Sequence, residues 1–198
     1  MNPGVTSERV FAALKEHILS GAVLPGEKLE PHLFADQLNS SVTPVRDALH
    51  RLAGERLVDM RASEGFYLPL VTEPGLRDLY QWNADLIRLA TRHWRADHVG
   101  GKADTLAADV GRATAMFFAL FATRSGNREH TQLIDHANDR LATPRVAERR
   151  VLDDLEAELR ALAVTFDNGT TSALLALVAR YHRRRLHATP AIVRALYG

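Results

Sequence analysis

Three amphipathic segments followed by two strand-like ones occupy the first 70 residues, and few folds accommodate this order. Residues 7–20 are predicted to form a helix because apolar side chains recur at helical spacing, at Val10, Phe11, Leu14 and Ile18. Two further helices are predicted, one over Pro31–Leu38 and one over 41–55, with apolar faces made of Leu33, Phe34 and Leu38 and of Val45, Ala48, Leu49 and Leu52. Two short strands are predicted after them, Leu57–Met60 and Phe66–Leu70, with a turn at Ser63-Glu64-Gly65.

Helix, helix, short turn, helix and hairpin is the order of elements in a winged helix-turn-helix. In that arrangement the second helix supports a third, whose first turn enters the major groove of DNA. The hairpin, or wing, contacts the DNA backbone or the minor groove. We therefore predict a DNA-binding domain over residues 1–71, followed by a second domain over 72–198.

Several linked motifs strengthen this prediction. They are Gly21–Leu29, Phe34–Leu38, Thr43–Leu49, Leu52 through Leu57-Val58, and Gly65. Together these segments resemble the GntR family of bacterial transcription regulators, and the resemblance covers about residues 7–70. It implies a winged-helix fold and a homodimer that binds a near-palindromic double-stranded DNA operator.

The resemblance also implies particular DNA contacts. Arg46 matches the arginine of the recognition helix, whose guanidinium suits phosphate or the O6 and N7 atoms of guanine. The other expected contacts are His32, Ser41, Val42, Thr43 and the wing-tip Gly65. Val42 departs from the family, which commonly has arginine there, so it would pack on a thymine methyl group or contribute little. The alternative role for Arg46 is a surface ion pair with Asp47 or Glu55.

The charge of this first segment argues against strong DNA binding. From Met1 to Glu73 there are seven Lys or Arg and ten Asp or Glu, a net charge of −3, whereas DNA-binding domains are usually basic. The charges can still be separated, with much of the acid on the far face and Arg46, Arg61 and the histidines toward DNA. We therefore predict that one domain binds DNA with modest affinity and that binding requires two half-sites.

The second half of the chain has helical periodicity throughout. Helices are predicted over 76–96, with Leu79, Leu86, Leu89 and Ala90 along it, and over Ala103–Thr123, Glu129–Leu141, Val146–Phe166, Thr171–His187 and Pro190–Leu196. Breaks are expected at Gly100-Gly101, 125–127, Thr143-Pro144 and 167–169. The fold class is therefore mainly α, a winged helix-turn-helix followed by an all-α bundle.

An all-helical region of this length after a GntR-type domain resembles the FCD branch, the fatty-acid-regulator type, most clearly over residues 117–127. The resemblance implies an effector-binding and dimerisation domain, often with a metal held by one aspartate and three histidines. Here Thr114 and Phe118 replace the first two ligands, and Glu158 or Leu159 replaces the third. His182 alone matches, and a single imidazole does not hold a metal ion.

No metal or other cofactor is therefore expected. His93 and His98, or His182 and His187, are five residues apart and face different sides of a helix. Thr114, Phe118 and His182 are instead the expected effector contacts, for a carboxylate or an apolar acid. Met116, Phe117, Phe118 and Phe121 either fill the core or line that pocket. The basic run 180–185 would be a solvated face, or would face an anionic ligand or a partner.

Sequence motifs for other functions are missing. The chain has no cysteine and none of the common hydrolase, phosphate-loop, metalloprotease or dinucleotide motifs, so we do not expect an enzyme. No membrane-length apolar run or signal-peptide pattern occurs, and a cytoplasmic location is expected. The sequence favours a DNA-binding transcription regulator, a repressor controlled by a small-molecule effector. The alternative is a dimeric helical ligand-binding or protein-docking module whose winged domain no longer binds DNA.

Overall fold

A computed structural model describes residues 3–62, 64–94 and 109–198, with side chains from residue 7 onward. The fold is mostly helical, with an N-terminal helix-turn-helix domain, a small sheet and a helical C-terminal domain, so the predicted fold class is confirmed. Contacts divide the chain into two compact units, residues up to Val71 and Thr72–Leu196. In the described part of the chain, no helix is both long enough and apolar enough to cross a membrane.

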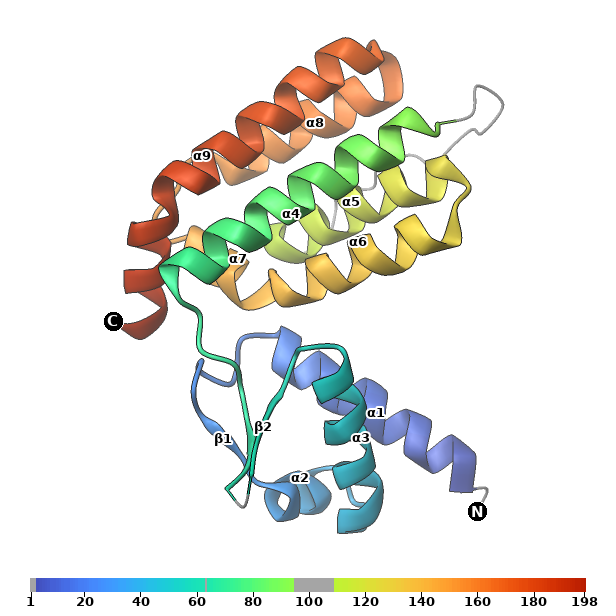
Figure 1. The fold of residues 1–198 in the computed structure, drawn as a ribbon, viewed down its shortest axis with the longest axis vertical. Helices are drawn as coiled ribbons and strands as arrows, with labels where there is room; N and C mark the ends of the chain where they lie inside the picture. The colour runs from blue at the N-terminus through green and yellow to red at the C-terminus, as the bar shows by residue number, and fades with distance from the viewer. Residues whose placement is uncertain (1–2, 63, 95–108) are drawn as a thin grey trace. The chain divides into compact units, whose positions relative to one another are not determined.

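The first unit has three helices and three strands (Figure 1). Its helices and strands are α1 (Pro3–Leu19), β1 (Lys28–Leu29), α2 (Pro31–Gln37), α3 (Val42–Gly54), β2 (Asp59–Arg61) and β3 (Gly65–Tyr67). The predicted faces of the first and third helices are confirmed, since Val10, Phe11, Leu14, Ile18, Val45, Ala48, Leu49 and Leu52 are all buried. Leu33 was wrongly assigned to the core, because α2 buries Phe34 and Ala35 and leaves Leu33 61% exposed.

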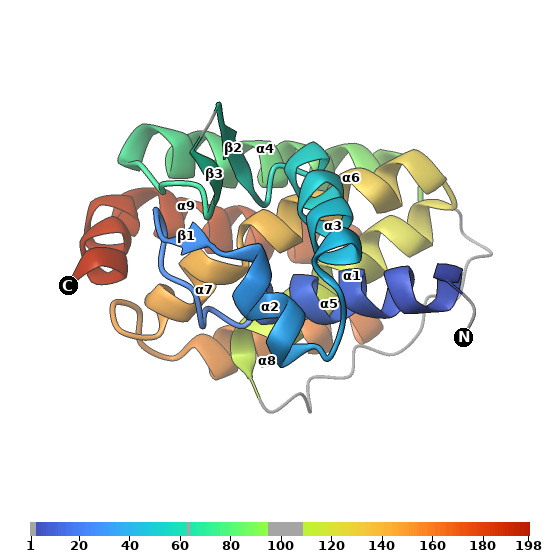
Figure 2. The same ribbon diagram turned by 90° about the horizontal axis from the view of Figure 1, so that it is seen from below.

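The sheet of the first unit has the order β1-β3-β2, and both pairings are antiparallel (Figure 2). The central strand pairs Phe66 with Leu29 on one side and with Met60 on the other. The sequence predicted the ends of β2 within two residues and those of β3 within three, but it did not predict β1, which is too short to show an alternating pattern. Ser63, in the predicted turn, lies outside the described residues.

The second unit consists of six helices in the described residues (Figure 1). They are α4 (Glu73–Arg92), α5 (Val110–Ser125), α6 (Arg128–Arg140), α7 (Ala142–Glu148), α8 (Leu155–Asn168) and α9 (Thr171–Tyr197). The predicted break at Gly100-Gly101 and the predicted start of a helix at Ala103 lie outside the described residues. Leu89, predicted on the buried stripe of α4, is 40% exposed.

The prediction of one helix over Val146–Phe166 is wrong. The chain leaves the helix after Glu148, and α8 begins only at Leu155, after Asp154 adopts a left-handed conformation with φ 53°. Acidic residues before and within the first turn of α8, at 153, 154, 156 and 158, favour a helix start there because they face the positive end of its dipole. The break expected at Thr143-Pro144 occurs two residues earlier, at Leu141 between α6 and α7, since proline is tolerated in the first turn of α7.

The predicted break before Pro190 is wrong as well, because α9 continues through Pro190 to Tyr197. A proline inside a helix removes one backbone N–H, so the carbonyl four residues earlier loses its donor. That carbonyl belongs to Leu186, and the guanidinium of Arg77 on α4 donates to it at 3.2 Å. A side chain therefore replaces the missing backbone donor, which helps α9 to remain one helix.

Aromatic side chains from α5 and α8 form the centre of the helical core. Phe117, Phe118, Phe121 and Phe166 are buried in mutual ring contact, at centroid distances of 5.3–5.9 Å. Of the two interpretations of this cluster, core filling therefore holds for the phenylalanines. Met116 does not belong to the cluster and is 49% exposed.

The bond between Arg77 and Leu186 predicts an energetic coupling between Arg77 and Pro190. Arg77→Met should lower the free energy of unfolding by about 0.5–1.5 kcal/mol, the contribution of one hydrogen bond. In a Pro190→Ala background, where residue 190 again donates to Leu186, the same substitution should cost less. Chemical denaturation of the two single variants and the double variant measures this difference, and equal costs in both backgrounds would contradict it.

Candidate nucleic-acid interface and ligand groove

The first turn of α3 presents polar side chains to solvent. Ser41 occupies the N-cap position, but its hydroxyl makes no capping hydrogen bond, and Thr43 and Arg46 are exposed. The opposite face of the helix is held in the core by Val45, Ala48, Leu49 and Leu52. Because that face is fixed by packing, the orientation of the polar face is fixed too.

A groove of about 450 Å³ runs between this helix, the start of α2 and the wing. It is lined by Lys28, Leu29, Glu30, Pro31, His32, Arg46, His50, Glu64, Gly65 and Phe66. Three of the predicted DNA contacts, His32, Arg46 and Gly65, therefore come together on one surface although they are far apart in the sequence. Ser41 and Thr43 lie one turn before Arg46 on α3, outside the groove lining.

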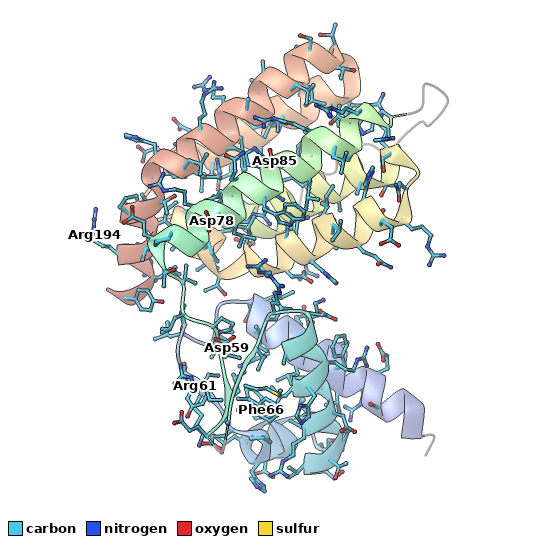
Figure 3. The ribbon with its side chains drawn as sticks, in the orientation of Figure 1. Asp59, Arg61, Phe66, Asp78, Asp85 and Arg194 are labelled. Carbon is cyan, nitrogen blue, oxygen red and sulfur yellow. The ribbon has the colours of Figure 1, made fainter. Side chains whose placement is uncertain are left out.

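The wing is anchored on one side and exposed on the other (Figure 3). Phe66 is buried and packs edge-on against the ring of His50 at 5.0 Å. Arg61 is exposed, and its guanidinium lies over the ring of Tyr67 at 4.0 Å. Gly65 has φ +105°, a conformation that residues with a side chain rarely adopt, so the wing requires glycine there.

The surroundings of Val42 and Arg46 decide between the alternatives that the sequence left open for each. Val42 is half-buried and packs against the core of its own domain, which favours the interpretation that it contributes little to DNA contacts. Glu55, one of the two possible partners of Arg46, instead accepts a hydrogen bond from Lys15 at 2.7 Å. In the described residues no ion pair joins Arg46 to Asp47 or to Glu55, so the guanidinium is available to a ligand.

Two side chains of the groove were not singled out by the sequence: Lys28 was not assigned a contact, and His50 was included only among the histidines expected to face DNA. Lys28 lies on β1, which the sequence did not reveal, and forms an ion pair with Glu30 at 2.8 Å. His50 lies one turn after Arg46 on the same side of α3, and its ring nitrogen Nδ1 is 3.1 Å from the sulfur of Met60. The spacing from Arg46 to His50 was the available signal, since residues four apart share a helix face.

Comparison with known proteins identifies this domain. Residues 6–68 match the family model described as bacterial regulatory proteins, gntR family. The N-terminal domain belongs to this family. The gntR domain thus spans the three helices and the wing described above.

Curated relatives are similar over part of the chain. The chain is 32% identical over 101 residues to the HTH-type transcriptional repressor GlaR of Escherichia coli, a match that covers 47% of this chain and 46% of that protein. It is 38% identical over 68 residues to the Nta operon transcriptional regulator of Aminobacter aminovorans, covering 34% and 32%. The matched stretch is therefore less than half of each of these relatives.

Solved structures are similar over nearly the whole chain. A transcriptional regulator GntR from Rhodococcus sp. RHA1 superposes with a TM-score of 0.78 at 19% identity, covering 93% of this chain and 97% of that one. The McbR/YncC protein of E. coli superposes with a TM-score of 0.72 at 18% identity, covering 98% and 99%. At such low identities the likeness shows only a shared fold. That shared fold includes the helical unit as well as the gntR domain.

The helical unit contains a buried network of charged groups. The guanidinium of Arg185 on α9 donates to Glu148 at 2.9 Å and to Glu158 at 2.7 Å, and Tyr80 on α4 donates to Glu148 at 2.6 Å. Burial, together with the charge and hydrogen bond of Glu148, raises the pKa of Tyr80 well above its usual value. The sequence interpretation of 180–185 as a solvated face is therefore wrong for Arg185, which is 2% exposed.

His182 lies beside this network, and its buried imidazole ring is neutral. Its Nδ1 is 2.8 Å from the backbone oxygen of Val178, and its Nε2 is 2.9 Å from the amide Oδ1 of Asn83. Burial lowers the pKa of His182 to about 4, and the positive charges of nearby arginines act in the same direction. A neutral ring has one N–H, and Val178 can only accept it. Nε2 is thus an acceptor, so we assign the amide of Asn83 the opposite orientation, with its NH2 toward the ring, which also gives that buried and otherwise unpartnered NH2 an acceptor.

The residues at three of the four expected metal positions do not fit a metal ion. Phe118 has no ligand atom and packs on His182 with ring centroids 5.7 Å apart, and the hydroxyl of Thr114 donates to the backbone of Val110. Both ring nitrogens of His182 are engaged by the groups described above. Among the described residues no group of three or more His, Cys, Asp or Glu is placed to bind a metal.

A second groove, of about 420 Å³, opens between α4 and α9. It is lined by Ala84, Arg88, Thr91, Arg92, Thr171, Leu175, Val178, Ala179 and His182. Of the three predicted effector contacts, His182 lines this groove, whereas Thr114 and Phe118 do not. Arg88 and Arg92 lie one turn apart on α4 and were not assigned to a site from the sequence; Arg88 also forms an ion pair with Asp85 at 3.1 Å.

The burial of neutral His182 predicts a loss of stability in acid. The unfolded histidine titrates near pH 6.5 and the folded one near 4, so the unfolded state binds more protons between these values. Lowering the pH from about 7 to 5 should therefore cost about 2 kcal/mol of unfolding free energy through this residue. The cost should be absent in His182→Gln and unchanged in His136→Gln, whose side chain is exposed on α6. Denaturant titrations at both pH values test this, and an unchanged pH dependence in His182→Gln would contradict it.

Proposed function

We propose that this protein is a DNA-binding transcription regulator, a repressor whose operator binding is modulated by a small-molecule effector in the helical domain. The observation that carries the proposal is the exposed polar first turn of α3 beside a groove lined by His32, Arg46 and Gly65, on a domain of the gntR family. Transcription regulation is also what the names of the relatives state of those proteins.

The proposed DNA contacts divide by what each side chain can reach. Arg46, exposed and free of ion pairs with its neighbours, has the forked donors that match the O6 and N7 atoms of guanine. The hydroxyls of Ser41 and Thr43 suit phosphate oxygens at the start of the helix. Arg61 and Gly65 bring the wing to the backbone or to the minor groove. Val42, packed inward, adds little.

A single gntR domain offers limited electrostatic attraction to DNA. The groove holds two cationic side chains, Lys28 and Arg46, and two anionic ones, Glu30 and Glu64. Few counterions would be released by one domain, so one half-site would bind weakly. We propose a homodimer on a near-palindromic operator, in which the second contact becomes intramolecular and raises the apparent affinity.

The helical unit is proposed to be an FCD-like domain with a degenerate metal site. The groove between α4 and α9 has two arginines at Arg88 and Arg92, an apolar wall at Leu175 and Val178, and the neutral ring of His182. This arrangement suits a carboxylate with an apolar body, and about 420 Å³ is in the range of small-molecule sites.

Helix α4 offers a route from effector to DNA-binding domain. It begins at Glu73, two residues after the first unit ends at Val71, and it also carries Arg88 and Arg92. An effector that binds one arrangement of α4 and α9 more tightly would shift the population of DNA-competent dimers. The free energy of that shift can be at most the difference in effector binding free energy between the two arrangements.

DNA binding is tested by selecting bound duplexes from random DNA with the full chain. A near-palindromic site is expected, and Arg46→Ala should weaken its binding by about 1–3 kcal/mol and relax one base position in each half-site. Arg56→Ala, which removes an exposed arginine beyond the end of α3 and outside the groove, is the matched control. If no sequence were enriched, the alternative of a ligand-binding or docking module without DNA recognition would be favoured.

The effector proposal is tested with a panel of apolar monocarboxylates and their uncharged amides. The acids should bind and the amides should not, and Arg92→Gln should raise the dissociation constant about tenfold or more, as expected for a charged hydrogen bond. Arg183→Gln, on the exposed side of α9, should leave it unchanged. Calorimetric titration of the full chain measures both. Equal binding of acids and amides would contradict a charged anchor.

A further inference from the structure

We propose that operator binding by the gntR domain takes up protons at His50 and His32, so that the affinity for DNA falls as the pH rises. This inference rests on the proposed function and adds two proton-dependent DNA contacts to it. Both histidines are exposed and line the groove between α2, α3 and the wing, beside Arg46.

The orientation of His50 follows from its contact with Met60. A thioether sulfur has no hydrogen and can only accept, so a hydrogen bond between it and the ring nitrogen 3.1 Å away assigns the proton of the neutral ring to Nδ1. The ring is also held edge-on against Phe66 at 5.0 Å. In the neutral ring Nδ1 is therefore the donor, and Nε2, which has no partner among the described residues, presents a lone pair.

A lone pair at Nε2 opposes a phosphate oxygen, which is itself an acceptor. Protonation converts Nε2 into a donor and makes the ring a cation, so His50 binds phosphate only in its protonated form. Histidine is the side chain whose ordinary titration falls between about pH 5 and 8, and a phosphate beside it favours the charged form. Binding to DNA and uptake of a proton are therefore linked at this residue.

Protonation of the two histidines changes the net charge of the groove. Lys28 on β1, Glu30 before α2, Arg46 on α3 and Glu64 in the wing are the other ionisable groups that line the groove, and their formal charges cancel. Asp36 lies one turn after His32 on α2, and Asp47 follows Arg46 on α3. With neutral histidines the groove has no net charge, whereas protonation of both gives it two positive charges toward DNA.

The test measures the affinity of the full chain for the duplex selected at about pH 6, at constant ionic strength, from pH 6 to 8. Over this range the dissociation constant should rise with pH, by up to about tenfold per pH unit for each coupled proton. His50→Gln should lower this slope, and the double variant with His32→Gln should abolish most of it. His50→Arg, permanently charged, should also lower the slope but retain tight binding at pH 8.

Two controls separate this inference from the proposed function. His17→Gln, in the same domain but packed on Phe34 outside the groove, should keep the wild-type slope. Calorimetry of wild type in buffers of different ionisation enthalpy should show proton uptake on binding. Tight binding with no pH dependence, or a slope unchanged in both His50 variants, would overturn the inference alone. No specific binding at any pH would overturn the proposed function.

Discussion

The buried guanidinium of Arg185 links four helices of the helical unit through hydrogen bonds. It is 2% exposed and contacts Glu148 on α7 and Glu158 on α8, while Tyr80 joins Glu148 to α4. A buried charge without its partners is costly, so these contacts hold α9 in one register against three other helices. The same register places His182 at the floor of the groove and Thr189 inside the helical core.

The two units differ in where their polar side chains lie. The core of the gntR domain is apolar, and the polar residues of α3 and the wing remain at the surface, where DNA would meet them. The helical unit buries Arg145, Glu148, His182 and Arg185, each of which has a polar partner in the interior. A buried polar site can discriminate between small ligands, because a poorly matched ligand leaves a polar group unpaired.

The helical unit also shows how local helix signals are overridden. Pro190 should end a helix, yet α9 continues because Arg77 supplies the donor that Leu186 lost. The turn between α7 and α8 occurs within a segment of regular helical periodicity, where Arg145 donates to Asn138 and Glu148 accepts from Tyr80 and Arg185. In both cases side chains of other helices form hydrogen bonds that support a backbone path which the local sequence did not indicate.

The sequence alone determined the order of the three helices and the hairpin in the first 70 residues, because local periodicity and turn residues specify helices, and Val45, Ala48, Leu49 and Leu52 mark the face of α3 that must be buried. It thereby also determined that Arg46 would be exposed. Only the tertiary structure revealed β1, the inward packing of Val42 and the contact that orients His50, since each depends on a residue distant in the chain. Arg185 is the clearest case: within the basic run its charge indicated solvent, and only the carboxylates of α7 and α8 stabilise it in the interior.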